Sequence, residues 1–296
     1  MKNIIQIGEF RLIERIKKNI IVSKDVVCGI GDDTAVLKYT KDKYLLLTSD
    51  MLVEGVHFTK MIPVFYIGRK ALAVSLSDIA AMGGIPKYAN VSIGLPKNTK
   101  MKFVDDLYHG INSLAKKYKI NIVGGDTVRS QKIVIDVTVI GEVSKAKLIL
   151  RDRARKGDLL FVSGPLGGSI RKRHYLFEPQ IKQAQYLVSN FKINSMIDLS
   201  DSLAISTNII AKQSNVGIVL YENLIPINAQ SNIHEALFMG EDFKLLFTVP
   251  KEYAKKLIKD KNFYEIGEVV DKILGVKFIN KNCKEITLKP KGFKHF

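Results

Sequence analysis

The sequence predicts an α+β protein of two domains, and three observations favour this fold class. Short apolar runs that are typical of strands alternate with longer segments of helical spacing along the chain. The 296 residues are enough for one large domain or for two of about 100–200 residues each. A charged stretch, SKAKLILRDRARKGD at residues 144–158, interrupts the pattern near the middle. We therefore expect domains at residues 1–148 and 149–296.

In the first half, strands are expected where short apolar runs end in polar residues, Gly or Pro. Four runs fit this description: residues 44–49, 88–95, 120–123 and 133–143. Two longer segments have helical spacing instead: residues 65–82, which stop at Gly83-Gly84, and residues 101–118. Strands and helices are therefore mixed throughout this half.

The second half shows the same mixture. One strand-like run ends at Ile197, and others occupy residues 159–163, 216–220, 243–249, 263–269 and 276–279. Helical spacing is found at residues 202–214 and 251–259. This repetition is the reason for assigning an α+β domain to each half.

The chain is strongly basic, but the charge is spread along its whole length. The net charge of +17 comes from 46 Lys+Arg against 29 Asp+Glu, and most of the excess is Lys. Bidentate contacts to phosphates and bases favour Arg, so a nucleic-acid-binding protein is only a minor alternative. No apolar run approaches the roughly 18–20 residues of a membrane-spanning helix, and Glu9, Arg11 and Glu14 interrupt the N-terminal segment. Cys28 and Cys283 lie far apart, so we expect a cytoplasmic protein without a disulfide framework.

Acidic residues are scarcer, and several lie beside glycine or at the ends of strand-like runs. They are Asp32 and Asp33 in GIGDDTAV, Asp50 and Glu54 in LLLTSDMLVEGVHF, Asp78 in SLSDIAAMGG, Asp126 in VGGDTVRS, Asp198 and Asp201 in IDLSDSLAIS, and Glu241 and Asp242 in MGEDFKLLF. Any one of them alone is equally well explained as a turn residue or a helix N-cap. Carboxylates gathered from several strand ends, however, repel one another unless cations compensate, and Mg²⁺ prefers oxygen ligands. The pattern therefore favours several Mg²⁺ ions between the protein and a polyphosphate, which the neighbouring glycines allow to approach the backbone.

Several catalytic motifs are absent from the sequence. There is no Walker A lysine motif, no HRD or DFG kinase motif, no GxSxG and no HExxH. The five histidines are scattered, so no covalent nucleophile is indicated. Phosphoryl transfer needs mainly positioning and charge neutralisation, which metals can supply, so it is the chemistry that the pattern favours.

Eight motifs in order along the chain resemble those of thiamine-monophosphate kinases. They are GEFRLI at 8–13, GIGDDTAVL at 29–37, TSDMLVEGVHF at 48–58, KALAVSLSDIAAMGG at 70–84, VGGDTVRS at 123–130, IDLSD at 197–201, GEDFKLLFTVP at 240–250 and GFKHF at 292–296. This family belongs to the superfamily of aminoimidazole-ribonucleotide synthetase and selenophosphate synthetase. The resemblance implies two domains of that type, a homodimer that pairs the N-terminal domains, and ATP-dependent phosphorylation of thiamine phosphate to thiamine diphosphate.

The resemblance also implies roles for individual residues where the motifs match. Metal ligands are implied at Asp33, Thr48, Ser49, Asp50, Asp78, Asp126, Asp198 and Asp201. Catalysis is expected to depend most on Asp33, Asp50, Asp78, Asp126 and Asp201. Contacts to ATP are implied at Gly125, Arg151 and Ser200, and contacts to thiamine phosphate at His57, Glu241 and the C-terminal aromatic residue Phe293.

The chain departs from the family pattern in three places. Ser202 and Met239 stand where the family usually has Gly, and residues 169–196 form a shorter stretch than usual. A Cβ at position 202 would be expected to crowd the nucleotide side, which leaves a catalytically silent homologue as one alternative. Another ATP-using enzyme of the superfamily, such as an aminoimidazole-ribonucleotide synthetase-like ligase, is a second.

Overall fold

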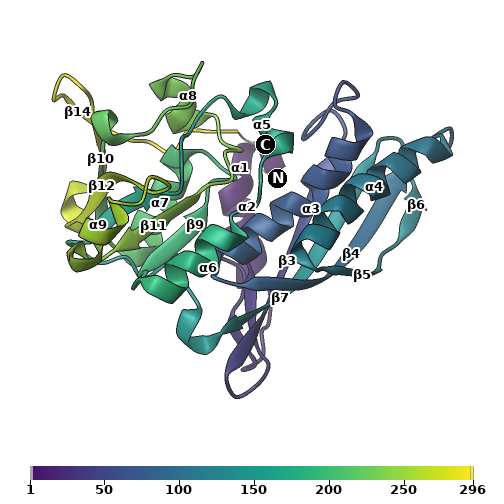
Figure 1. Ribbon diagram of the computed structural model, residues 1–296, viewed down its shortest axis with the longest axis horizontal. Coiled ribbons are helices and arrows are strands. Elements are labelled where there is room, and N and C mark those ends of the chain that lie inside the picture. The colour runs from purple at the N-terminus through teal and green to yellow at the C-terminus, as the bar shows by residue number, and fades with distance from the viewer. Residues whose placement is uncertain (1–2, 294, 296) are drawn as a thin grey trace.

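The computed structural model describes residues 3–293 and 295, and its strands form two mixed β-sheets. Strands between residues 26 and 144 form the first sheet, and strands between residues 159 and 287 form the second. Figure 1 shows the sheets side by side, the first at the right and the second at the left. The predicted α+β class is confirmed, whereas the domain boundary at residue 148 stays a prediction.

The first sheet has the strand order β1-β2-β3-β7-β4-β5, with β6 paired to β4. Its strands are β1 (Val26–Cys28), β2 (Ala35–Lys38), β3 (Lys43–Val53), β4 (Ile85–Leu95), β5 (Asn121–Gly124), β6 (Thr127–Arg129) and β7 (Val134–Ser144). Strand β7 runs antiparallel to both β3 and β4, whereas β5 and β6 run parallel to β4. Helices α3 (Val64–Ala81) and α4 (Met101–Tyr118) pack together, and α3 lies against β3 and β7 (Figure 1).

Strand β3 separates a buried face of the first sheet from an open one. Side chains alternate along a strand, so Leu46 and Thr48 are buried while Leu47 and Met51 are exposed. Asp50 shares the face of Thr48, and its carboxylate accepts a hydrogen bond from a serine of α3. The strand is therefore longer than residues 44–49, and its extension carries an acid to the helix-covered face.

The second sheet has the strand order β14-β13-β10-β12-β8-β11-β9. Its strands are β8 (Leu159–Val162), β9 (Ser195–Asp198), β10 (Gly217–Tyr221), β11 (Leu245–Val249), β12 (Tyr264–Val270), β13 (Val276–Ile279) and β14 (Glu285–Thr287). The helices of this half are α5 (Arg173–Leu176), α6 (Ile181–Asn190), α7 (Leu203–Ser214), α8 (Ile233–Phe238) and α9 (Lys251–Leu257). Short 3₁₀ segments are η1 (Lys145–Lys147), η2 (Ser169–Arg171), η3 (Glu222–Leu224) and η4 (Lys272–Leu274).

Both faces of the second sheet are buried. On one face, Leu160 and Val162 join a core with the apolar side chains of α7. On the other face, Phe161 packs in a core with α6 and α9 that is continuous with the core under α3. Helix α3 therefore belongs to the packing of both halves, and its central turns lie where the halves meet.

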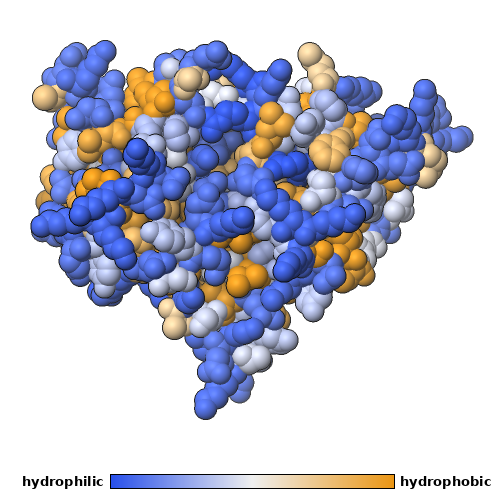
Figure 2. Space-filling view, in the orientation of Figure 1, coloured by the Kyte–Doolittle hydropathy of each residue, from blue (hydrophilic) through white to orange (hydrophobic). Residues whose placement is uncertain are grey.

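The N-terminal helices α1 (Ile4–Ile7) and α2 (Glu9–Lys18) have no buried side chains. Hydrophilic side chains cover most of the face in Figure 2, with apolar patches between them. Within residues 3–293 and 295, no helix combines the length and the hydropathy that crossing a membrane requires.

Candidate active site

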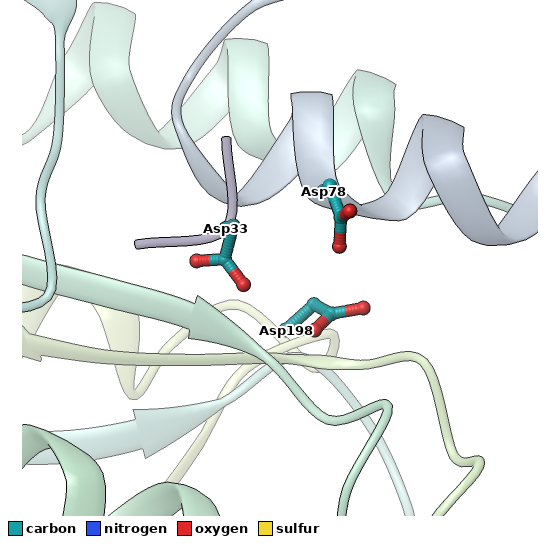
Figure 3. Close-up of side chains that lie close together, drawn as sticks. All are labelled: Asp33, Asp78 and Asp198. Atoms are coloured by element: carbon teal, nitrogen blue, oxygen red, sulfur yellow. The ribbon is translucent and has the colours of Figure 1, made fainter. Parts of the chain in front are cut away.

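Three carboxylates from distant parts of the sequence meet where the two halves join. Asp33 lies in the loop before β2, Asp78 in the last turns of α3, and Asp198 at the end of β9. Each can offer one oxygen within 4.8 Å of those of the other two, and Figure 3 shows the three side chains around a common space. We call Asp33, Asp78 and Asp198 the carboxylate group; it brings together three of the predicted metal ligands.

Hydroxyl groups hold these carboxylates in place. Thr48 donates to Asp78 over 2.6 Å, and Ser77 donates to Asp198 over 2.6 Å. Ser200, a predicted ATP contact, donates to the second oxygen of Asp198 over 2.8 Å. The bond from Ser77 on α3 to Asp198 on β9 crosses between the two halves, so their packing helps to fix the geometry.

The carboxylates lie in an environment that disfavours their charged form. Burial, followed by the nearby charge of Asp33, raises the pKa of Asp198 to about 7, and burial raises that of Asp50 to about 6. Burial beside Asp50 and Asp198 also holds the pKa of Asp78 well above its usual range. Burial beside Asp33 raises the pKa of Asp32 to about 7. Five acids are therefore crowded into a poorly hydrated space.

Arg151 is the cation that partly offsets this charge. Its Nε donates to Asp33 Oδ2 over 3.1 Å, Nη2 donates to Asp33 Oδ1, and its main-chain nitrogen donates to Asp32 over 3.1 Å. The side chain is 17% exposed, so this bidentate pair is screened from water. One guanidinium cannot balance several ionised carboxylates, so further positive charge has to come from bound cations or protons.

The residues fit a magnesium site. All candidate donors are oxygens, as Mg²⁺ prefers, and the raised pKa values mark a deficit of positive charge. The buried Oγ1 of Thr34, the residue after Asp33, has no hydrogen-bond partner among the described residues.

Other predicted ligands lie outside the carboxylate group. Ser49 is the clear correction, because its hydroxyl faces the opposite side of the sheet and bonds Asp136 and Thr138 over 3.0–3.1 Å. This geometry does not support its side chain as a ligand in the same site as Thr48. Asp126 is exposed in the loop after β5 and accepts the amide of the following residue.

Two further predicted residues have clear surroundings. Asp201 lies at the entrance to α7, where burial and the nearby charge of Glu9 raise its pKa. Gly125 has a packing reason to be glycine, because a Cβ there would lie 1.8 Å from the carbonyl oxygen of Val91. Its predicted contact to ATP stays a prediction.

A second polar group lies beside the carboxylate group and contains the predicted acceptor contact Glu241. The ammonium of Lys70 donates to Glu241 over 2.5 Å and to the carbonyl oxygen of His57 over 2.9 Å. It also lies 3.0 Å from Nδ1 of His174. We call Lys70, His174 and Glu241 the lysine group. Sequence reasoning missed Lys70 and His174; a lysine within the apolar run KALAVSL was the available signal for a buried charge.

The C-terminal segment reaches the same place. The ring of His57 lies 5.3 Å from that of His295, which in turn lies 4.9 Å from the ring of Phe293. Phe293 is 55% exposed, so its ring is accessible to a ligand. The predicted acceptor contacts are thus linked: Lys70 joins Glu241 to the main chain of His57, and the ring of His295 lies between those of His57 and Phe293.

Ser202 links the start of α7 to the C-terminal segment. Its hydroxyl accepts the amide of Ile205, which caps α7, and donates to the carbonyl oxygen of Lys291 over 2.6 Å. These bonds tether the start of α7 to the segment that carries Phe293, and the expected crowding of the nucleotide side stays a prediction.

Comparisons with known proteins agree with this geometry. Residues 31–143 match the family model described as AIR synthase related protein, N-terminal domain, and residues 154–278 match the corresponding C-terminal domain. Thiamine-monophosphate kinase from Aquifex aeolicus is 37% identical, with 98% of this chain and 99% of the relative covered. The protein of that name from Bacillus subtilis is 35% identical, with 97% and 99% covered.

A solved structure described as AaThiL complexed with AMPPCP and TMP has a TM-score of 0.86 and 34% identity. The match covers 100% of this chain and 99% of that one. Sequence similarity over nearly the full length and similarity of fold therefore agree, and the chain belongs to the thiamine-monophosphate kinase family.

Proposed function

We propose that this protein transfers the γ-phosphoryl group of ATP to thiamine phosphate, giving thiamine diphosphate and ADP. The observation that carries the proposal is the carboxylate group, placed at the junction of the halves in a chain of this family. The bond from the γ-phosphorus to its bridging oxygen breaks, and a bond to an oxygen of the acceptor phosphate forms. The solved relative with AMPPCP and TMP supports the same pair of ligands.

Asp33, Asp78 and Asp198 would hold Mg²⁺, with Thr48 and Asp50 beside them. Bound Mg²⁺ would offset the negative charge of the transferring phosphoryl group and its neighbours. The protein's own part is to fix the two anionic substrates close together in a site with little water. We assign Arg151 and Ser200 to ATP, and His57, Glu241 and Phe293 to thiamine phosphate, as the family resemblance implies.

The acceptor explains why a site without a general base is sufficient. A phosphate oxygen is already ionised near neutral pH, whereas an alcohol needs its proton removed as it attacks. The acids of the carboxylate group are proposed metal ligands, and His57 already accepts the amide of Val53 at Nδ1 over 3.0 Å. The thiazolium of thiamine is cationic, which suits a carboxylate such as Glu241 or an aromatic face such as Phe293.

An ADP-release assay tests this function. We expect turnover with thiamine phosphate and Mg²⁺, and little without Mg²⁺ or with free thiamine. Equal conversion of free thiamine would overturn both the acceptor and the reasoning about the missing base. A panel containing substrates of the related ligases separates this activity from the alternative within the superfamily.

We also propose a homodimer that covers the open face of the first sheet. Leu47, Met51, Tyr88 and Ile140 are each more than a third exposed on or beside that face. Apolar area of this kind is commonly covered in symmetric oligomers. Light scattering should give twice the chain mass of 33.2 kDa, whereas a monomer at micromolar concentration would contradict the dimer. The cytoplasmic location stays a prediction from the sequence.

A further inference from the structure

Lys70 is a charged residue in a place where charge is costly. It lies in the middle of α3 and is 1% exposed. Burial lowers the pKa of its ammonium group, while the neighbouring charge of Glu241 acts in the opposite direction. Lysine is almost never fully buried without such partners, and apolar residues would fill the space at lower cost. The arrangement of hydrogen-bond partners around Lys70 should therefore explain why a charged residue is buried here.

The hydrogen bonds of Lys70 are all used within the protein. An ammonium group has three protons and no acceptor, and Lys70 has three acceptors in range. They are Glu241 Oε1 at 2.5 Å, the carbonyl oxygen of His57 at 2.9 Å and His174 Nδ1 at 3.0 Å. Nδ1 of His174 must then be unprotonated, which agrees with the lowered pKa that burial and Lys70 give this ring. No proton of Lys70 is left for a substrate.

Glu241, in contrast, is only partly enclosed. Its side chain is 33% exposed, although Lys70 holds Oε1 and Oε2 lies 3.5 Å from His174 Nδ1. Its backbone has φ of +54°, a conformation that costs energy for a residue other than glycine. The loop is held in this shape by the Glu241 amide, which donates to Ser200, and by Gly240 oxygen, which accepts from Ser169.

We propose that Lys70 is the positioning residue for the acceptor site: it fixes the direction of the Glu241 carboxylate toward thiamine phosphate. The same ammonium holds the main chain at His57, so it sets both predicted acceptor contacts at once. Helix α3 also carries Asp78, eight residues further on, or about 12 Å along the helix axis. One rigid helix thereby fixes the spacing between the acceptor contacts and the carboxylate group. This inference depends on the proposed function.

The test compares two neighbouring tethers on the same helix. Arg69 also joins α3 to the second half, through Glu178 over 2.7 Å and the carbonyl oxygen of Phe177, but it does not touch Glu241. Lys70→Met should raise the KM for thiamine phosphate about tenfold or more, with kcat and the KM for ATP changed less than about threefold. Arg69→Met should lower the melting temperature without this selective change in KM.

A double-mutant cycle shows whether Lys70 acts through Glu241. In the Glu241→Gln background, Lys70→Met should raise the KM for thiamine phosphate by less than about twofold. Equal selective effects of Lys70→Met in both backgrounds, or the same KM change in Arg69→Met, would overturn the positioning role. Calorimetric binding of thiamine phosphate gives the same comparison without turnover. Absence of binding and turnover in the unaltered protein would instead refute the proposed function on which the inference depends.

Discussion

The carboxylate group and the lysine group both include a residue of α3, about 12 Å apart along the helix axis, but their buried charges are compensated in opposite ways. In the first, Arg151 is the nearby guanidinium, and the pKa values of Asp78 and Asp198 are raised. In the second, one buried ammonium has an acceptor for each proton. The first arrangement is incomplete without cations or protons from solution, whereas the second is complete within the protein.

This difference in charge compensation indicates a different role for each group. Buried charge that the protein does not compensate destabilises the fold unless a bound ligand carries the opposite charge. Such an arrangement therefore indicates a binding site. An arrangement with every hydrogen bond made is rigid, and it is suited to holding other residues in position. The chain therefore contains both a site whose charge requires bound cations and a fully hydrogen-bonded group that can hold other residues in position.

The largest effect is expected from neutralising the carboxylate group. Asp78→Asn and Asp33→Asn should each reduce ADP release by about 10²-fold or more, because they remove charge that would hold the metal at the reacting phosphates. The metal-free Asp78→Asn protein should melt at the same or a higher temperature than the unaltered protein, because repulsion is relieved. Normal turnover in both variants would contradict the proposed role.

Asp158 provides the matched control for this substitution. It is also buried, but it accepts two hydrogen bonds from Asn194 over 2.9–3.0 Å and one from the amide of Arg155 over 2.9 Å. Asp158→Asn should therefore lower the melting temperature and leave the kinetics of the remaining folded protein nearly unchanged. Equal destabilisation by Asp78→Asn and Asp158→Asn would contradict the distinction between an acid that is repelled by neighbouring acids and an acid whose hydrogen bonds are all made within the protein.

The two groups should also respond oppositely to pH in the metal-free protein. Folding raises the pKa of Asp198 to about 7, so the folded state binds more protons between about pH 4 and 7, and this acid makes stability fall as pH rises. Folding lowers the pKa of His174, so this base makes stability rise with pH up to about 6.5. Chemical denaturation at pH 5 and pH 8 measures both contributions. Asp198→Asn should lower the free energy of unfolding at pH 5 relative to that at pH 8, whereas His174→Gln should raise it. Changes of the same sign in both variants would refute this assignment.

A smaller effect is expected where Ser202 fastens the C-terminal segment. Ser202→Gly and Ser202→Ala both remove the hydrogen bond to Lys291, so both should raise the KM for thiamine phosphate about threefold. Their stabilities should differ, because glycine remains an acceptable N-cap while alanine costs about 1 kcal/mol. Thermal melts and kinetics measured together separate the two roles. If the KM for thiamine phosphate instead changes in proportion to the loss of stability in the two variants, Ser202 acts only as the N-cap of α7 and not as a tether of the C-terminal segment.

The sequence predicted elements whose patterns are local. Helix α4 occupies the expected residues 101–118, and α3 is displaced by one residue from the expected 65–82. The acids beside glycine or at strand ends were predicted to share a site, and the carboxylates of three of them, Asp33, Asp78 and Asp198, lie within 4.8 Å of one another. Ser49 was predicted as a metal ligand together with Thr48 and Asp50, but strand alternation places its side chain on the face opposite to theirs.

The pairing of Lys70 with His174 and Glu241 could not be predicted because these residues are distant in the sequence. Lys70 is 104 residues from His174 and 171 residues from Glu241. Only the packing of the second half against α3 brings them together, and no local spacing encodes it. The pairing of Arg151 with Asp33, 118 residues away, has the same origin. Charge compensation across the junction is therefore a property of the folded structure.

The most direct test of the contrast is a magnesium titration followed by thermal unfolding. If the carboxylate group is incomplete without cations, Mg²⁺ with a non-hydrolysable ATP analogue should raise the melting temperature of the metal-free protein to a plateau. The gain should correspond to about 2.7 kcal/mol at a hundredfold excess over Kd. Asp78→Asn should show a much smaller rise, whereas Lys70→Met should show the full one. An equal rise in all three proteins, or none in the unaltered protein, would contradict the assignment of the carboxylate group as the cation site.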